Sequence, residues 1–376
     1  MNIRASALAL MLIGTAAAYP QTNPPALLAD GHRLWEQRLS KSAIAAFEAA
    51  TRERAAAAEA WEALGRIYMF KGWQQEGVFP GWHDETEYRD KAIAAFQASL
   101  EIDPSRASAA DGLKEARAFM NAPGVVAAAA PRPEIAKLDA ALEAWRTSNR
   151  PVAELEALFE ERTRLQADPA PYFSVAQMLL ERREFARATD LATRGEYAAT
   201  RFIDENEGAY KMAGKARGAR DRSRAAALDI RGVAALERME YEQAARLLDE
   251  AERLSRGQDF AVQVHLGDLA LAQKDLDRAQ AHYVNALSLT GGAAPLRNRA
   301  TEALMGIRAS LEDSAGFDAW LAETVGRRRE ERRTQLLRSV VDRPLPPLSL
   351  TGLDGRPVDL AALRGKVLLL NFFSSW

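Results

Sequence analysis

Small residues and large apolar residues recur along this chain at a spacing that favours pairs of closely packed helices. One helical face of residues 59–68 carries four of them at i, i+3, i+4 and i+7: Trp61, Leu64, Gly65 and Tyr68. Residues 91–104 place Ala92 and Phe96 on a second helix, which Pro104 ends because proline cannot continue a helix. Small residues let two helices approach and aromatic rings fill the space between them, so the pattern predicts a helical hairpin.

The same phase recurs at four other places along the chain. The matching positions are Gly31, Ala43 and Phe47; Tyr172, Ala176, Phe185 and Ala188; Leu228, Gly232, Tyr241, Ala244 and Leu248; and Leu266, Gly267, Ala279, Tyr283 and Ala286. Units that keep one phase predict an all-α fold, a solenoid of stacked helical hairpins in which each unit contacts its neighbours.

This pattern resembles the tetratricopeptide repeat, whose period is 34 residues. The resemblance implies a scaffold that holds peptide or helix segments of client proteins in its groove. We expect one array of repeats in residues 19–120 and a second array with a connecting helix in residues 134–343. Residues 121–133 are rich in Ala and Pro and are predicted to link the two arrays.

Residues 72–91 lengthen the second unit beyond the repeat period and bring four aromatic residues close to Gly and Pro: Trp73, Phe79, Trp82 and Tyr88. Such aromatics can form a binding lip, because insertions in repeat proteins often lie on the binding face. An ordered loop whose rings pack on the neighbouring repeats is the simpler interpretation. Trp73, Phe79 and Trp82 are the candidate partner-binding residues.

Two charged runs have both a functional and a simpler interpretation. The first is basic and surrounds a single Asp221: Lys211, Lys215, Arg217, Arg220, Arg222 and Arg224. It can contact an acidic partner or an anionic envelope surface, but charge runs are usually solvated, so we expect a solvated loop between repeats. The second run, residues 327–333, predicts a solvated helical face on which Glu330 and Glu331 pair with their own neighbours.

Charge balance and histidine content argue against two classes of partner. The formal net charge is −2 and the pI is about 6.2, so nucleic acid is not expected as the main partner. The chain has no cysteine, and its four histidines are scattered: His32, His83, His265 and His282. Neither a zinc site nor another cofactor is therefore expected.

The N-terminus predicts export from the cytoplasm. Arg4 precedes a short apolar stretch, residues 5–13, and Ala16 and Ala18 form a small-residue cleavage pattern. We expect residues 1–18 to be a signal peptide cleaved near Ala18, which places the mature protein in a periplasm. The apolar stretch is too short to cross a bilayer comfortably, so no integral membrane segment is expected after cleavage.

Residues 344–376 follow a different pattern, after prolines end the helical part. Asp354 and Gly355 form a hairpin turn pair between two short strand-like segments. Residues 367–373 are a nearly continuous apolar run, which is typical of a strand covered on both faces. The sequence therefore predicts the first strands of an incomplete α/β domain.

This segment resembles the opening of thioredoxin-like domains of the TlpA and AhpC/TSA redoxin type. The matching residues are Pro347, Leu350, Asp354, Gly355, Leu360, Leu363, Gly365, Lys366, Asn371, Phe372, Phe373 and Trp376. In that family a Cys-x-x-Cys motif follows the tryptophan and performs thiol–disulfide exchange, so the resemblance implies that Ser374, Ser375 and Trp376 flank the active site. No catalytic residue can be assigned within the chain itself.

The sequence stops at the position where that family has its first cysteine, and three explanations are open. The sequence is a fragment, the reading frame contains a UGA codon that encodes selenocysteine, or the gene has decayed. We expect an exported thiol–disulfide oxidoreductase whose repeats recruit clients and redox partner proteins. The alternative is a non-enzymatic periplasmic repeat scaffold for protein–protein interaction.

Overall fold

The computed structural model describes residues 24–53, 56–76, 85–118, 133–206, 215–311 and 315–338. Every regular element within these ranges is an α-helix, which confirms the predicted all-α solenoid. The predicted signal peptide, nearly all of the predicted linker and the predicted strands lie outside the described residues.

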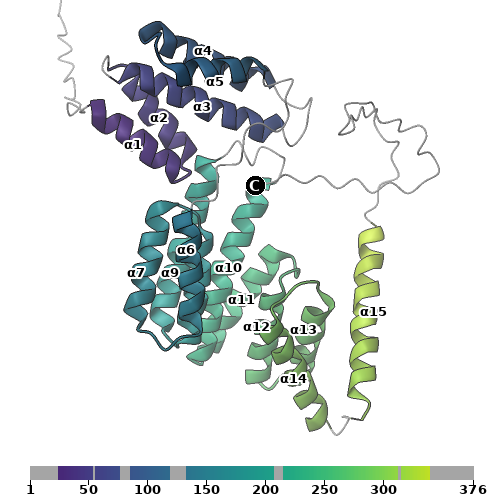
Figure 1. Cartoon of the computed structure of the whole chain (residues 1–376). Coiled ribbons are helices and arrows are strands. Elements are labelled where there is room, and N and C mark those ends of the chain that lie inside the picture. The colour runs from purple at the N-terminus through teal and green to yellow at the C-terminus, as the bar shows by residue number, and fades with distance from the viewer. Residues whose placement is uncertain are drawn as a thin grey trace, which may run out of the picture.

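The helices form two consecutive groups (Figure 1). The first array contains α1 (Pro24–Glu36), α2 (Ser40–Ala50), α3 (Ala57–Glu76), α4 (Glu85–Ile102) and α5 (Ala107–Ala118). The second array contains α6 (Pro133–Arg146), α7 (Val152–Leu165), α8 (Ala170–Glu181), α9 (Phe185–Glu205), α10 (Lys215–Glu237), α11 (Tyr241–Ser255), α12 (Phe260–Ala272), α13 (Leu276–Ser288), α14 (Ala294–Ser310) and α15 (Phe317–Leu337).

Successive helices pair as hairpins, and we call the earlier member the leading helix and the later member the following helix. In α12, a Cβ atom at Gly267 would lie 2.6 Å from the ring of Tyr283 on α13, so only glycine admits the ring at this distance. Gly31 meets Phe47 in the same way between α1 and α2. These contacts confirm the predicted phase and make the hairpins tetratricopeptide-like.

The hairpin of α8 and α9 reverses this arrangement. Its glycine, Gly195, lies on the following helix, where an added Cβ would be 2.8 Å from Tyr172 and 3.1 Å from Phe173 on the leading helix. Ala176 and Ala188 are fully buried, as small residues at a helix–helix contact must be. The close approach is therefore kept although the glycine and the aromatic residues have exchanged helices.

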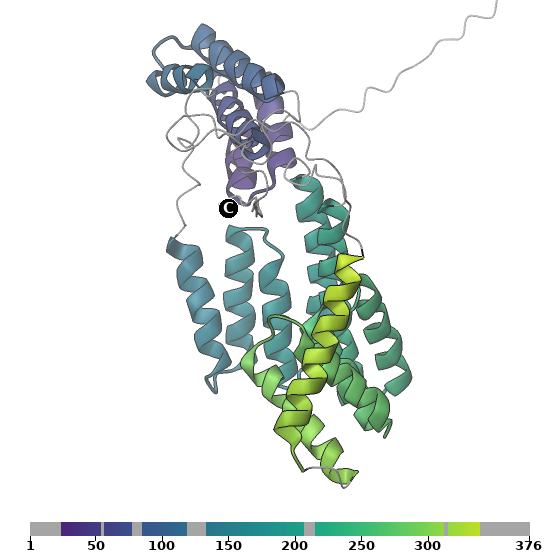
Figure 2. The same cartoon turned by 90° about the vertical axis from the view of Figure 1, so that its right-hand side faces the viewer.

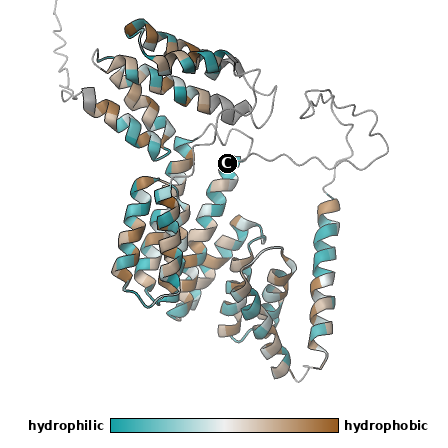
Figure 3. Ribbon diagram, in the orientation of Figure 1, coloured by the Kyte–Doolittle hydropathy of each residue, from teal (hydrophilic) through white to brown (hydrophobic). Residues whose placement is uncertain are grey.

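Hydrophilic and hydrophobic residues are interspersed along the helices (Figure 3). The buried residues form separate clusters, each shared by neighbouring helices. One cluster joins α12, α13, α14 and α15 around Tyr283, and another joins α1, α2 and α3 around Phe47. Stability thus comes mainly from contacts between adjacent units, as in other repeat proteins.

The predicted insertion is partly helical. Helix α3 continues to Glu76 and α4 begins at Glu85, so the loop interpretation is wrong for residues 72–76 and 85–91. A single glycine such as Gly72 weakens a helix without ending it, which explains the continuation. Tyr88 packs against Tyr68 with ring centroids 6.2 Å apart.

The solvated loop predicted for the basic run is also wrong for residues 215–224, which form the first turns of α10. Arg, Lys and Ala are good helix formers, and the run has few competing residues. Acidic residues of neighbouring helices pair with two of its arginines: Arg220 with Asp204 at 2.5 Å and Arg224 with Glu250 at 2.7 Å. Lys211 lies outside the described residues.

The two arrays are joined at the start of α2. This helix has no side-chain cap of its own, because its N-cap residue is Leu39. Glu205, at the end of α9, accepts hydrogen bonds from the Ser42 backbone N–H at 2.8 Å and from its hydroxyl at 2.5 Å. A carboxylate at a helix N-terminus satisfies a free N–H and the helix dipole, so the second array caps a helix of the first.

Helix α15 runs across the end of the second array (Figure 2). Phe317 and Val325 join the core cluster that contains residues of α13 and α14. Towards its C-terminal end the contacts become polar, and Arg329 donates to the Leu287 carbonyl oxygen of α13 at 3.2 Å. The internal pairs predicted for this helix are present, with Arg328 and Glu331 3.0 Å apart and Arg333 and Glu330 3.6 Å apart.

Candidate protein-binding surface

Polar side chains connect several leading helices to the next one. In the first array they join α1, α3 and α5; in the second they join α10, α12 and α14. The polar pairs of this row include His32–Glu59, Glu62–Arg106, Asp229–His265 and Asp268–Arg299. We call the surface formed by α10, α12 and α14 the leading-helix face of the second array.

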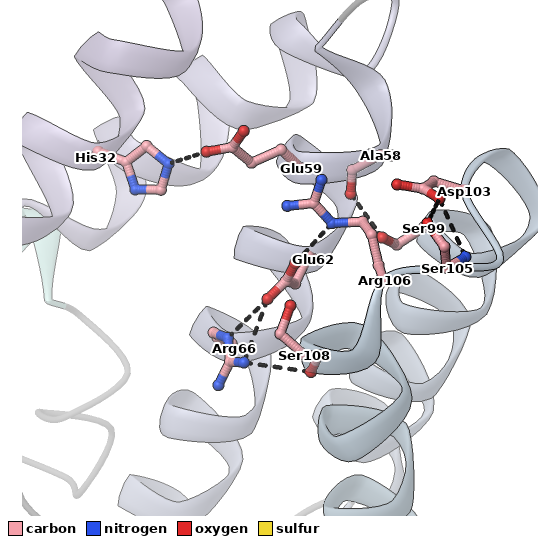
Figure 4. A network of polar contacts seen from close by, with 10 residues as sticks. All are labelled: His32, Ala58, Glu59, Glu62, Arg66, Ser99, Asp103, Ser105, Arg106 and Ser108. Atoms are coloured by element: carbon pink, nitrogen blue, oxygen red, sulfur yellow. Dashed lines mark hydrogen bonds and ion pairs between the residues drawn. The ribbon is translucent and has the colours of Figure 1, made fainter.

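Glu62 is the centre of the network in the first array (Figure 4). It accepts from Arg106 Nε at 2.8 Å and from Arg66 Nη2 at 3.2 Å, and Arg66 also donates to the Ser108 carbonyl oxygen at 3.3 Å. Burial raises the pKa of Glu62, but hydrogen bonds from Arg106, Ser108 and Arg66 outweigh burial and lower it below its usual value. Glu62 is therefore an ionised structural group that fixes α3 against α5.

The network of the second array repeats with the sequence period. His265 and Arg299 are 34 residues apart, and each pairs with an aspartate of the preceding leading helix. His265 Nδ1 lies 2.7 Å from Asp229 Oδ1, and Arg299 Nη2 lies 3.0 Å from Asp268 Oδ2. Tyr283 adds a hydrogen bond from its hydroxyl to Asp268 Oδ1 at 2.7 Å. Positive and negative side chains are thus matched one to one.

Burial and neighbouring charges set the protonation of this network. Burial lowers the pKa of His265, but the carboxylate of Asp229 outweighs it, so the pKa lies above its ordinary value of 6.5. Burial and the Asp268 carboxylate raise the pKa of Tyr283, which keeps its hydroxyl a donor. The network therefore holds neighbouring leading helices together, because its charged members are paired with one another.

Two apolar side chains on the same helices remain exposed. Leu271 on α12 and Met305 on α14 are 34 residues apart and therefore occupy the same position in successive repeats. Leu271 is 38% exposed and Met305 is 49% exposed. In the sequence, Leu271 comes after the paired Asp268 of α12, and Met305 comes after the paired Arg299 of α14. The leading-helix face of the second array therefore combines a charge-balanced centre with accessible apolar groups.

The structure does not bring the predicted site residues together within its described part. The backbone of Trp73 belongs to α3, whereas Phe79 and Trp82 lie outside the described residues. Ser374, Ser375 and Trp376 also lie outside them. Sequence reasoning missed Leu271 and Met305, although the repeat phase that identified Gly267 also places both on the leading helices.

Among the described residues, no three His, Cys, Asp or Glu side chains are grouped so that they could hold a metal ion. Among the described helices, none combines the length and apolar character that a bilayer-spanning segment needs.

Comparisons with known proteins add the following. No protein-family profile matches the chain, and no curated protein sequence matches it. The crystal structure of yeast Tom70 is similar to this chain with a TM-score of 0.25 and 16% sequence identity, over 83% of this chain and 69% of that chain. The repeat assignment rests on the packing of glycine against large side chains in the hairpins.

Proposed function

We propose that this protein is a protein-interaction scaffold whose leading-helix face in the second array binds an apolar segment of a partner protein. The observation that supports this function is the exposure of Leu271 and Met305 at equivalent positions of two successive leading helices. Helical-repeat arrays use extended surfaces of this kind to bind proteins and peptides.

The electrostatics of the surface favour an apolar partner segment. The aspartates, His265 and Arg299 are already paired, so they offer little net charge to a strongly acidic or basic peptide. Leu271 and Met305 still expose a third to a half of their area, and covering each contributes about 1 kcal/mol. Methionine adapts its shape to different partners, which suits a scaffold.

A pair of charge substitutions tests this proposal. L271E and M305E place a carboxylate in the proposed contact without removing any member of the ion-pair network. M239E is the matched control, because Met239 is 73% exposed in the turn between α10 and α11. In pull-downs from extracts of the source cells, the wild type and M239E should retain the same partner, and L271E/M305E should lose it. Equal retention by L271E/M305E would exclude this surface.

The aromatic insertion is a second proposed contact. In this proposal Trp73, Phe79 and Trp82 contact the same partner, and their joint replacement by alanine tests this role. A partner that binds the triple variant with unchanged affinity would show that the insertion only packs on the repeats.

A redox function is the second candidate, and the sequence match of residues 347–376 to the opening of thioredoxin-like domains favours it. In this proposal an exported protein carries the repeats beside a thioredoxin-like domain, and the repeats recruit its clients. The nucleotides after the Trp376 codon provide the test. An in-frame UGA or Cys codon and a long continuation support thiol–disulfide exchange, and the absence of any in-frame continuation would contradict it. Export is tested separately, by N-terminal sequencing of the mature protein for cleavage near Ala18.

A further inference from the structure

A polar cleft of about 400 Å³ lies between the C-terminal end of α11, the turn that follows it, α13 and α15. It is separate from the leading-helix face, because α11 and α13 are following helices. Four arginines line it: Arg253, Arg256, Arg328 and Arg332. Helix α15 supplies two of them, so the cleft exists only where this helix crosses the array.

The positive charge of the cleft is only partly balanced. Two carboxylates, Asp249 and Glu252, also line it. Asp249 pairs with Arg278, which is outside the lining, at 3.3 Å, and Glu252 accepts from Gln263 Nε2 at 2.8 Å. Gln263 is neutral, so Glu252 keeps its negative charge beside the cleft, but the four lining arginines still outnumber the two carboxylates.

Two guanidinium groups converge on a single neutral oxygen. Arg332 Nη2 donates to Asn285 Oδ1 at 2.5 Å, and Arg328 Nε donates to the same atom at 3.2 Å. Like charges held this close repel each other, and an amide oxygen cannot neutralise them. Arg328 has Glu331 as a partner at 3.0 Å, so Arg332 is the group whose charge is left uncompensated.

Arg332 has only neutral acceptors among the described residues. Besides Asn285, they are Gln258 Oε1 at 3.2 Å and the Gly257 carbonyl oxygen at 3.4 Å. Its Nε atom is buried and donates to no acceptor in the described chain. Burial and the nearby Arg328 lower its pKa, as expected for a partly desolvated charge beside a like charge. An anion in the cleft would supply the missing charge.

We propose that this cleft binds a multiply charged phosphate-type oxyanion carried by a small molecule. Guanidinium groups form two parallel hydrogen bonds with phosphate oxygens, which makes arginine the preferred residue for this ligand class. The cleft is several times larger than one phosphoryl group, so it has room for the attached moiety. The exposed Arg256, at the left-handed end of α11, is available to close over the ligand.

Inorganic pyrophosphate is the probe for a calorimetric titration of the full chain, with citrate and ionic-strength-matched chloride as comparison anions. We expect pyrophosphate to bind, and R256Q and R332Q each to weaken it about 10-fold, the loss expected for one charge-assisted contact. R333Q is the matched control, because Arg333 is on the same helix, pairs with Glu330 and does not line the cleft.

Three results would overturn the proposal. Pyrophosphate does not bind, citrate binds as tightly as pyrophosphate, or R333Q weakens binding as much as R256Q does. If R332Q fails to fold, R256Q still decides, because Arg256 is exposed and makes no ion pair within the described residues.

Discussion

Replacing Gly267 with alanine tests whether the ring of Tyr283 is fixed against its leading helix. The added Cβ would lie 2.6 Å from the ring, and an ordinary contact needs about 3.5 Å. Tyr283 is fully buried, and its hydroxyl donates to Asp268 at 2.7 Å. The ring therefore cannot retreat without disturbing either the core or this hydrogen bond.

The expected magnitude follows from two opposing effects. Overpacking a filled core costs about 1–3 kcal/mol, and moving the ring weakens a hydrogen bond to a charged group. The change from glycine to alanine within a helix recovers about 1 kcal/mol of helix propensity. We expect G267A to lower the free energy of unfolding by about 1–2 kcal/mol.

Gly306 provides the matched control. It is also within a leading helix, α14, and a Cβ atom there would meet nothing within 4 Å. G306A should raise the free energy of unfolding by about 0.5–1 kcal/mol, so the two alanine variants should differ by about 1.5–3 kcal/mol. Urea unfolding followed by far-ultraviolet circular dichroism measures this difference. Equal shifts of the two midpoints would refute the packing argument.

Three further perturbations test other features. E62Q should destabilise the protein by about 1–3 kcal/mol at neutral pH. Because the folded-state pKa of Glu62 is lowered, the ionised carboxylate stabilises the fold above the unfolded-state pKa, and this stabilisation is lost as pH falls through the folded-state pKa. The urea unfolding midpoints of wild type and E62Q should therefore converge on acidification, and a constant difference between them would contradict this. By NMR, the His265 ring should titrate with a pKa above 6.5 in the wild type and below 6.5 in D229N. Since the folded-state pKa is raised, the stabilisation from this pair is complete below pH 6.5 and is lost as pH rises through the folded-state pKa. An unchanged titration midpoint of His265 in D229N would be inconsistent with its pairing to Asp229. E205A should accelerate amide hydrogen exchange at Ser42, measured by mass spectrometry, whereas equal exchange in both proteins would show that Glu205 does not cap α2.

Periodicity predicts the repeats well because the packing rule is local. Gly267 and Tyr283, like Gly31 and Phe47, are 16 residues apart, and that distance spans one hairpin. A reader of the sequence needs only the helical period to place such a pair face to face. The same phase also contained the positions of Leu271 and Met305, but their exposure depends on what neighbouring helices leave uncovered.

The arginine cleft and the junction of the arrays could not be predicted in this way. Arg332 reaches Asn285 and Gly257, which are 47 and 75 residues away, because α15 crosses the array instead of continuing the repeat. The run that contains Arg332 also satisfies the pattern of a solvated helical face. Residues 327–333 make both ion pairs within α15 and contacts with distant residues, and sequence spacing can predict only the ion pairs within the helix.

The cap that Glu205 provides for α2 has a consequence for the order in which the protein matures during synthesis. The two residues it joins are 163 positions apart, whereas most helix contacts in the described chain lie between neighbouring helices. Until α9 has been synthesised, the first turn of α2 has no carboxylate from Glu205 to accept its N–H. The N-terminal array therefore reaches its final stability only after residue 205 has emerged, so a nascent chain stalled before that point exposes a less stable N-terminal array to chaperones and proteases.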